Sequence, residues 1–422
     1  MKDEKEPVGQ EQDSEKEEYS FLQEVIKEEA GDRKKWRHDV LRRVKLGIIF
    51  GLAACFTFFA CRSWIEKQFE GDPTQVIIPQ DEQEEEEQVQ EPAQEQETVL
   101  NADTYRQMLT NLKQLAQEAG KSVVEIQGAA TEEEFSNDLE CKKKSISGMI
   151  VADNGQELLI LGKVLPVKDA KIIRVTFPGN AHCDATLKSQ DAGLGLCIYS
   201  VQRKLIDDDT WSQISIATLG VSKVVKKGDI VVAIGELFGT DKVCEYGVIE
   251  SSEKYLDKAD GQYQKIYTDL SGDVQGSGIL VNIRGEVVGI IDSSVWEEKE
   301  QNQISGYGIS DIKDVLELLS NGKNVPYMGM SCMEVTEDMQ NQGFPQGVYV
   351  KEVDAGSPAM AAGIQSGDII TSVAGTEVTT FLGYHNILMK QSVGDKISVQ
   401  GKRQGAGGEY VDIDFEVIIN KK

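Results

Sequence analysis

The chain has 422 residues, 40% of them hydrophobic, so two or more domains with a sizeable core are expected. Its formal net charge of −27 argues against a nucleic-acid partner, because phosphate binding needs clustered lysine and arginine. Seven cysteines stand at irregular spacing without a C-x-x-C pair. We therefore expect buried free thiols rather than a disulfide framework or a metal site, and no cofactor is indicated.

Residues 1–45 are an acidic and then basic tail. The acidic part, to about residue 30, is predicted to be disordered, although an amphipathic helix near residues 19–29 could dock a partner. Residues 46–65 are mostly apolar and end in a tryptophan and an isoleucine. A buried helix and a signal peptide are the alternatives, but a signal peptide starts near the N-terminus. The basic flank therefore predicts a single transmembrane signal anchor with a cytoplasmic N-terminus and the rest of the chain outside.

Residues 66–103 are rich in Glu and Gln and are predicted to be an extended linker that buries no core. A helix is predicted over residues 104–119, where apolar residues recur at helical spacing before Gly120. From Ser122 onward the chain has many short apolar runs broken by glycines. Such runs are typical of a β-sandwich or a β-barrel.

The stretch Tyr267–Asp292 contains two β-rich runs, Gly278–Ile283 and Glu286–Ile290, that flank a tight turn. Ser277 stands between two glycines in a loop before the first run. This stretch resembles the nucleophile segment of trypsin-like proteases of the HtrA/DegP family. The resemblance implies that residues 104–322 form a trypsin-like double β-barrel with a leading helix, and that a homotrimer is possible.

Residues 326–420 resemble the PDZ domain of the same family, an α+β fold. The motifs are Y-M-G-M, G-S-P-A before a helix, and G-D-I-I. The resemblance implies that a peptide C-terminus binds as an added strand, and methionines suit varied apolar side chains. The candidate peptide-binding residues are Tyr327, Met328, Gly329, Met330, His385 and Met389. Whether Met330 and Met333 line the groove or belong to the core is left open.

A serine hydroxyl is a poor nucleophile until an oriented base takes its proton. In the alignment with the family, the histidine position falls on Leu165 and the aspartate position on Gly195. Gln275 stands where the family has a glycine whose N–H helps to build the oxyanion hole. Ser277 is therefore interpreted as a vestigial nucleophile.

Two residues are alternative bases for Ser277. Lys163 could form a Ser–Lys dyad, since a buried lysine can lose its proton. His182 lies in a turn between the two missing positions, where a surface histidine is the ordinary interpretation.

The sequence thus predicts a mostly β, membrane-anchored HtrA-like pseudoprotease. It would bind C-termini of peptides or unfolded proteins outside the membrane, as a quality-control or regulatory scaffold. An active endopeptidase with Lys163 or His182 as base, and a signalling anchor that acts through its acidic tail, are the alternatives.

Overall fold

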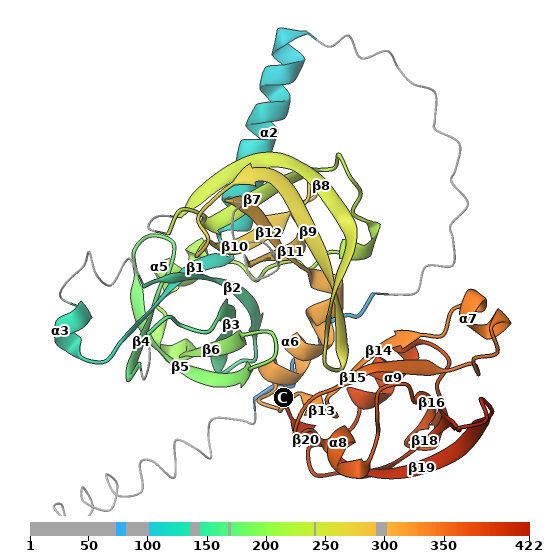
Figure 1. The fold of residues 1–422 in the computed structure, drawn as a ribbon. Helices are drawn as coiled ribbons and strands as arrows, with labels where there is room; N and C mark the ends of the chain where they lie inside the picture. Colours follow the sequence, from blue (N-terminus) through green and yellow to red (C-terminus); the bar gives the residue numbers. More distant parts are fainter. Residues whose placement is uncertain (1–72, 82–100, 136–143, 168–169, 240–241, 293–301) are drawn as a thin grey trace, which may run out of the picture. The chain divides into compact units, whose positions relative to one another are not determined.

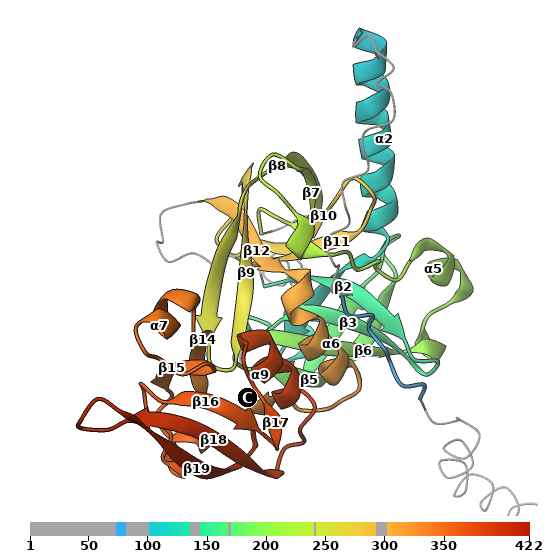
Figure 2. The same cartoon turned by 90° about the vertical axis from the view of Figure 1, so that its right-hand side faces the viewer.

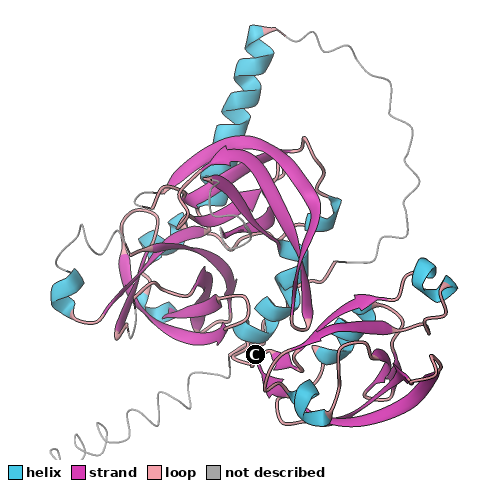
Figure 3. Ribbon diagram, in the orientation of Figure 1, coloured by secondary structure: helices cyan, strands magenta, loops and turns pink. Residues whose placement is uncertain are grey.

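The computed structural model describes residues 73–81, 101–135, 144–167, 170–239, 242–292 and 302–422. The predicted anchor at residues 46–65 and the tail before it lie outside these ranges. Within them, no helix combines the length and the apolar character needed to cross a membrane. Strands dominate the described part, as Figure 3 shows, which confirms the mostly β fold class.

The first β-barrel is closed and its strands follow the order β1-β2-β3-β6-β5-β4 (Figure 1). These strands are β1 Val123–Ala129, β2 Ile146–Asp153, β3 Glu157–Lys163, β4 Ile172–Thr176, β5 His182–Asp191 and β6 Leu196–Gln202. All neighbouring pairs are antiparallel. Closure leaves no unpaired sheet edge.

The second β-barrel is closed in the order β10-β11-β12-β9-β8-β7. Its strands are β7 Ile230–Glu236, β8 Val243–Lys258, β9 Gly261–Ser271, β10 Ser277–Val281, β11 Val287–Asp292 and β12 Gln303–Gly308. β8 and β9 form the longest hairpin of the barrel, and Figure 2 shows it extending toward strand β14 of the next domain. This pair of barrels confirms the predicted double-barrel domain.

The cores follow from strand alternation, because successive side chains point to opposite faces of a strand. On β3, Leu158 and Ile160 belong to a cluster made by the first barrel alone. Their neighbours Leu159 and Leu161 belong to a cluster that contains residues of both barrels. β3 is therefore buried on both faces, and its second face packs the barrels together.

The PDZ domain contains a main sheet with strand order β14-β15-β16-β18-β19, and β17 pairs with β16. Its strands are β14 Met330–Glu334, β15 Val348–Val353, β16 Ile369–Val373, β17 Thr376–Glu377, β18 Lys396–Gln404 and β19 Tyr410–Ile418, with β13 Pro326–Tyr327 paired to β20 Asn420–Lys421. Its helices are α7 Glu337–Asn341, α8 Pro358–Ala362 and α9 Phe381–Leu388. The G-S-P-A motif precedes a helix as expected, because Ser357 caps α8 and Pro358 occupies its first turn. Gly363 ends α8 in the left-handed conformation.

The remaining helices connect or precede the barrels. Asn101 accepts two backbone N–H bonds and starts α2, Ala102–Gly120, over the predicted helix. The others are α3 Glu132–Phe135, η1 Arg203–Leu205, α5 Asp208–Gln213, η2 Ser222–Val224, η4 Ile309–Ile312 and α6 Lys313–Ser320.

The linker is predicted to bury no core, and residues 73–81 correct this prediction because they pack onto the barrels. Val76 and Ile78 are buried in the cluster shared by both barrels. Their N–H groups donate to Asn321 and Glu317 in and after α6, at 2.9 Å each. The two apolar side chains distinguish this segment from the Glu/Gln-rich remainder of the linker.

The four cysteines within the described residues are free thiols. Cys183, Cys197 and Cys332 are buried, as expected. Cys244 is exposed on β8, which corrects the expectation for that thiol.

Candidate functional site

Ser277 is the first residue of strand β10, not a loop residue as the sequence suggested. Its register partners are Glu236 on β7 and Asp292 on β11, and it is only 2% exposed. β7 and β10 approach closely here: a Cβ on Gly278 would lie 2.2 Å from the Ile234 carbonyl oxygen. The glycine permits strand pairing to begin at the serine, which explains the difference.

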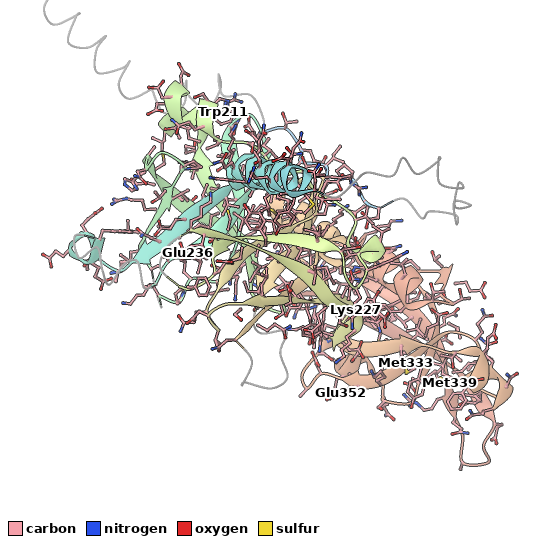
Figure 4. All side chains as sticks on the ribbon, turned by 90° about the horizontal axis from the view of Figure 1, so that it is seen from above. Trp211, Lys227, Glu236, Met333, Met339 and Glu352 are labelled. Atoms are coloured by element: carbon pink, nitrogen blue, oxygen red, sulfur yellow. The ribbon has the colours of Figure 1, made fainter. Side chains whose placement is uncertain are left out.

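The Ser277 hydroxyl oxygen takes part in a buried hydrogen-bond chain between the barrels. The Ser147 N–H on β2 donates to Ser277 Oγ at 2.8 Å. The Ser147 hydroxyl accepts the Glu236 N–H at 2.7 Å, and the Ser145 hydroxyl donates to the Glu236 carboxylate at 2.9 Å. Glu236, labelled in Figure 4, is itself buried. The serine thus connects β10 of one barrel to β2 of the other.

Within the described residues, neither alternative base is hydrogen-bonded to Ser277. Lys163 Nζ donates to Asp292 Oδ1 at 3.1 Å, and the Asp292 side chain is buried. His182 is exposed at the start of β5, where its Nδ1 lies 3.0 Å from Thr176 Oγ1. The lysine is an ion-pair partner, and the histidine belongs to a surface hairpin.

The two positions that the alignment predicts for the histidine and the aspartate are occupied by Leu165 and Gly195. Leu165 packs against the apolar interior of the first barrel. Gly195 has φ +68°, in the left-handed region that favours glycine, and its carbonyl accepts the Val164 N–H at 3.0 Å. A base and its orienting carboxylate are therefore absent from these two positions.

Backbone N–H groups of the loop before Ser277 form hydrogen bonds within the loop itself. The Gln275 N–H, which the resemblance predicts at the position of an oxyanion-hole donor, donates to Asp273 Oδ1 at 2.8 Å. The Gly276 N–H bonds to the Asp273 carbonyl at 2.9 Å. An oxyanion hole needs N–H groups aimed at the place where charge develops, and both of these are aimed at Asp273.

The cavity beside Ser277 is far too small for a peptide. Its volume is about 10 Å³, and its lining includes Ser147, Lys163 and Ile290. A single water needs roughly 10–15 Å³. In this conformation a peptide segment does not fit into the cavity next to the hydroxyl.

The PDZ loop, by contrast, holds a carboxylate. Met328 and Gly329 donate their N–H groups to Asp260 Oδ2 at 2.8 and 2.7 Å, and the Met330 N–H donates to Oδ1 at 3.2 Å. Asp260 lies in the β8–β9 turn and is fully buried. Three of the predicted peptide-binding residues therefore converge on one acidic side chain of the second barrel.

The other predicted peptide-binding residues are more scattered. His385 Nδ1 lies 3.0 Å from the Asp260 carbonyl, beside the same turn. The Tyr327 hydroxyl donates to Asp354 at 2.7 Å, and Met389 is half-buried against the cluster shared by both barrels. Met330 is a core residue of the PDZ domain.

Two residues at this loop are absent from the sequence-based set. One is Asp260, for which the Asp-Gly pair signals only a hairpin turn. The other is Tyr384 on α9, whose hydroxyl donates to Asp260 Oδ1. Burial, and next the Asp260 carboxylate, raise the pKa of Tyr384 well above its usual value, so it remains a protonated donor.

Comparisons with known families divide the chain into the same two domains. Residues 146–290 match the model of the trypsin-like peptidase domain, and residues 326–417 match that of the PDZ domain. The HtrA-type protease AlgW solved with a tripeptide superposes with a TM-score of 0.50 at 19% identity, covering 74% of this chain and 97% of that one. This similarity supports the fold.

The chain is also similar in sequence to serine proteases named HtrA or DegP-like. The chain is 28% identical over 280 residues to the serine protease Do-like HtrA of Bacillus subtilis, and the alignment covers 61% of each. It is 29% identical over 279 residues to a probable periplasmic serine endoprotease DegP-like of Hahella chejuensis, covering 64% of this chain and 56% of that one. The chain therefore spans less than two thirds of the length of these relatives. By domain content and similarity, the chain is a homologue of the HtrA/DegP serine proteases, with a trypsin-like peptidase domain followed by a PDZ domain.

Proposed function

We propose that this chain is a membrane-anchored HtrA-like protein without proteolytic activity. Its PDZ domain binds exposed C-termini of peptides or unfolded proteins on the outer side of the membrane. It serves there as a quality-control or regulatory scaffold, and the barrels carry the PDZ domain.

The observation that carries the loss of activity is the hydrogen bond from the Ser147 N–H to the buried Ser277 hydroxyl oxygen. A triad serine must also give its proton to a base and meet a substrate carbonyl, and Ser277 is only 2% exposed. Lys163 forms an ion pair with Asp292, and His182 is exposed beside Thr176. Neither position favours the alternative of an active endopeptidase.

Peptide binding is supported by the chemistry of the loop at residues 328–330. Its N–H groups hold a carboxylate, the group that ends every unmodified peptide. AlgW, a protein of the same fold, has been solved with a tripeptide and with a decapeptide. Strand β14 follows the loop and offers an edge for an added strand.

Fluorophosphonate labelling of the purified full-length chain tests the proposal. We expect no labelling above the background of Ser277→Ala, because no base activates the hydroxyl and no space admits the probe. Circular dichroism of both proteins shows that they are folded. Labelling that depends on Ser277 would overturn the pseudoprotease assignment, and Lys163→Met and His182→Ala would then identify the base.

A further inference from the structure

The turn of the β8–β9 hairpin resembles the end of a bound peptide. The turn consists of Ala259 and Asp260, and Asp260 has φ +59°. Aspartate is one of the few residues other than glycine that tolerate a positive φ. The turn lies next to the first residue of β14, since the Asp260 N–H donates to the Met330 carbonyl at 2.7 Å.

The side chain of Asp260 saturates the carboxylate-binding loop. Oδ2 accepts hydrogen bonds from the N–H groups of Met328 and Gly329. Oδ1 accepts hydrogen bonds from the Met330 N–H and from the Tyr384 hydroxyl. Three convergent backbone donors satisfy one carboxylate. A second carboxylate cannot accept from the same donors at the same time.

The backbone of Asp260 completes the resemblance to a peptide. Its N–H pairs with the carbonyl of a β14 residue, and His385 on α9 lies within hydrogen-bond distance of its carbonyl. Strand pairing on one side and helix α9 on the other are the two walls of peptide binding by strand addition. Asp260 therefore supplies both a strand-like backbone and a carboxylate, at the place where a C-terminal residue would bind.

We propose that Asp260 is an internal ligand of the PDZ domain, which a peptide C-terminal carboxylate must displace before it can bind. This inference rests on the proposed peptide-binding function and names its competitor. The free chain then has a closed form, with Asp260 in the loop, and an open form, with the loop free. Only the open form binds peptide, so the apparent affinity is reduced by the fraction of open molecules.

Further contacts hold the hairpin in the closed form. Lys351 of the PDZ domain pairs with Asp257 at 2.5 Å, and Lys422 Nζ donates to the Ala259 carbonyl at 2.7 Å. Gln262 donates to the Cys332 carbonyl at 3.4 Å. These contacts lie on both sides of Asp260 and favour its return to the loop.

The test measures peptide affinity of the full-length chain with and without the Asp260 carboxylate. Asp260→Gly removes the carboxylate and suits the positive φ of the turn, and Asp260→Asn keeps the shape but loses one acceptor oxygen. Asp412→Ala is the control for loss of an acidic side chain, because Asp412 lies on β19 of the PDZ domain, is 84% exposed and forms an ion pair with Lys402. The probe is a fluorescein-labelled decapeptide with an apolar, free C-terminus, compared with its C-terminal amide.

We expect Asp260→Gly and Asp260→Asn to bind the free-carboxylate peptide about tenfold more tightly than the unmodified chain, as for a form that is about one tenth open. Asp412→Ala should match the unmodified chain, and the amide should bind none of them. Hydrogen exchange of the Met328, Gly329 and Met330 amides provides a readout without peptide, and it should be faster in Asp260→Gly.

The outcomes separate the two proposals. Equal peptide affinities of the unmodified chain and Asp260→Gly would overturn the internal ligand while leaving peptide binding intact. Unchanged amide exchange in Asp260→Gly would show that Asp260 does not occupy the loop. If exchange accelerates but neither chain binds the free-carboxylate peptide, the proposed peptide-binding function fails, and competition fails with it.

Discussion

At the scale of single residues, the Ser277 hydroxyl oxygen is an acceptor in the interface between the barrels. It satisfies the buried N–H of Ser147, whose own hydroxyl satisfies the N–H of Glu236. A buried N–H group without an acceptor costs free energy, so each of these donors depends on the hydroxyl oxygen that accepts its hydrogen bond. The serine is thus needed for polar satisfaction between the barrels, independently of any nucleophilic role.

Ser277→Ala should lower the free energy of unfolding by about 1–3 kcal/mol, because the Ser147 N–H loses its acceptor in a buried site. Urea unfolding measures the loss. Ser212→Ala is the matched control, since the Ser212 hydroxyl donates to Asp209 at an exposed site and its removal should change stability by less than about 0.5 kcal/mol. Equal stability of the two variants would argue against a structural role for Ser277.

At the scale of elements, the loop between β13 and β14 depends on one glycine. Gly329 has φ +86°, and a Cβ there would lie 2.3 Å from Ser357 Cβ and 2.7 Å from the Tyr327 hydroxyl oxygen. The same glycine donates its N–H to Asp260. The loop is therefore specified by a residue that combines positive φ with close packing.

Gly329→Ala should destabilise the chain by more than the roughly 1–2 kcal/mol of the backbone penalty alone, because the methyl group also clashes. Gly343→Ala is the matched control, since Gly343 has φ +95° in the same domain but nothing lies within 4 Å of an added Cβ. Thermal unfolding compares the two variants. Peptide affinity in the Asp260→Gly background should fall for Gly329→Ala and stay unchanged for Gly343→Ala. Similar losses of stability in both variants would contradict the clash.

The elements were largely predictable because their signals are local. Short apolar runs and turn residues indicate the barrels, and the G-S-P-A motif indicates a capped helix. The start of β10 at Ser277 was not predictable, because it depends on the close approach of β7, a contact distant in sequence. The burial of Val76 and Ile78 depends likewise on α6, more than 200 residues away.

At the scale of the whole molecule, the site at the PDZ loop contains a contact between two domains that no local sequence pattern predicts. The loop residues Met328, Gly329 and Met330 follow from the Y-M-G-M motif, but Asp260 is 68 residues from the first of them. An Asp-Gly pair predicts a turn, and nothing local predicts which domain that turn contacts. The assignment of the histidine and aspartate positions to Leu165 and Gly195 stays a prediction from the alignment.

The proposed anchor concerns the whole molecule, because it decides where both domains act. Deleting residues 46–65 should move the chain from the carbonate-washed membrane fraction to the supernatant, since residues 46–61 form a continuous uncharged and mostly apolar run. Deleting residues 1–30 is the matched control and should leave the chain in the membrane fraction, because that segment is acidic and polar. Fractionation followed by immunoblotting measures both variants. Retention of the first variant in the membrane would refute the anchor and place membrane association, if any, in the folded domains, whereas release of the second would indicate that the tail contributes to membrane binding.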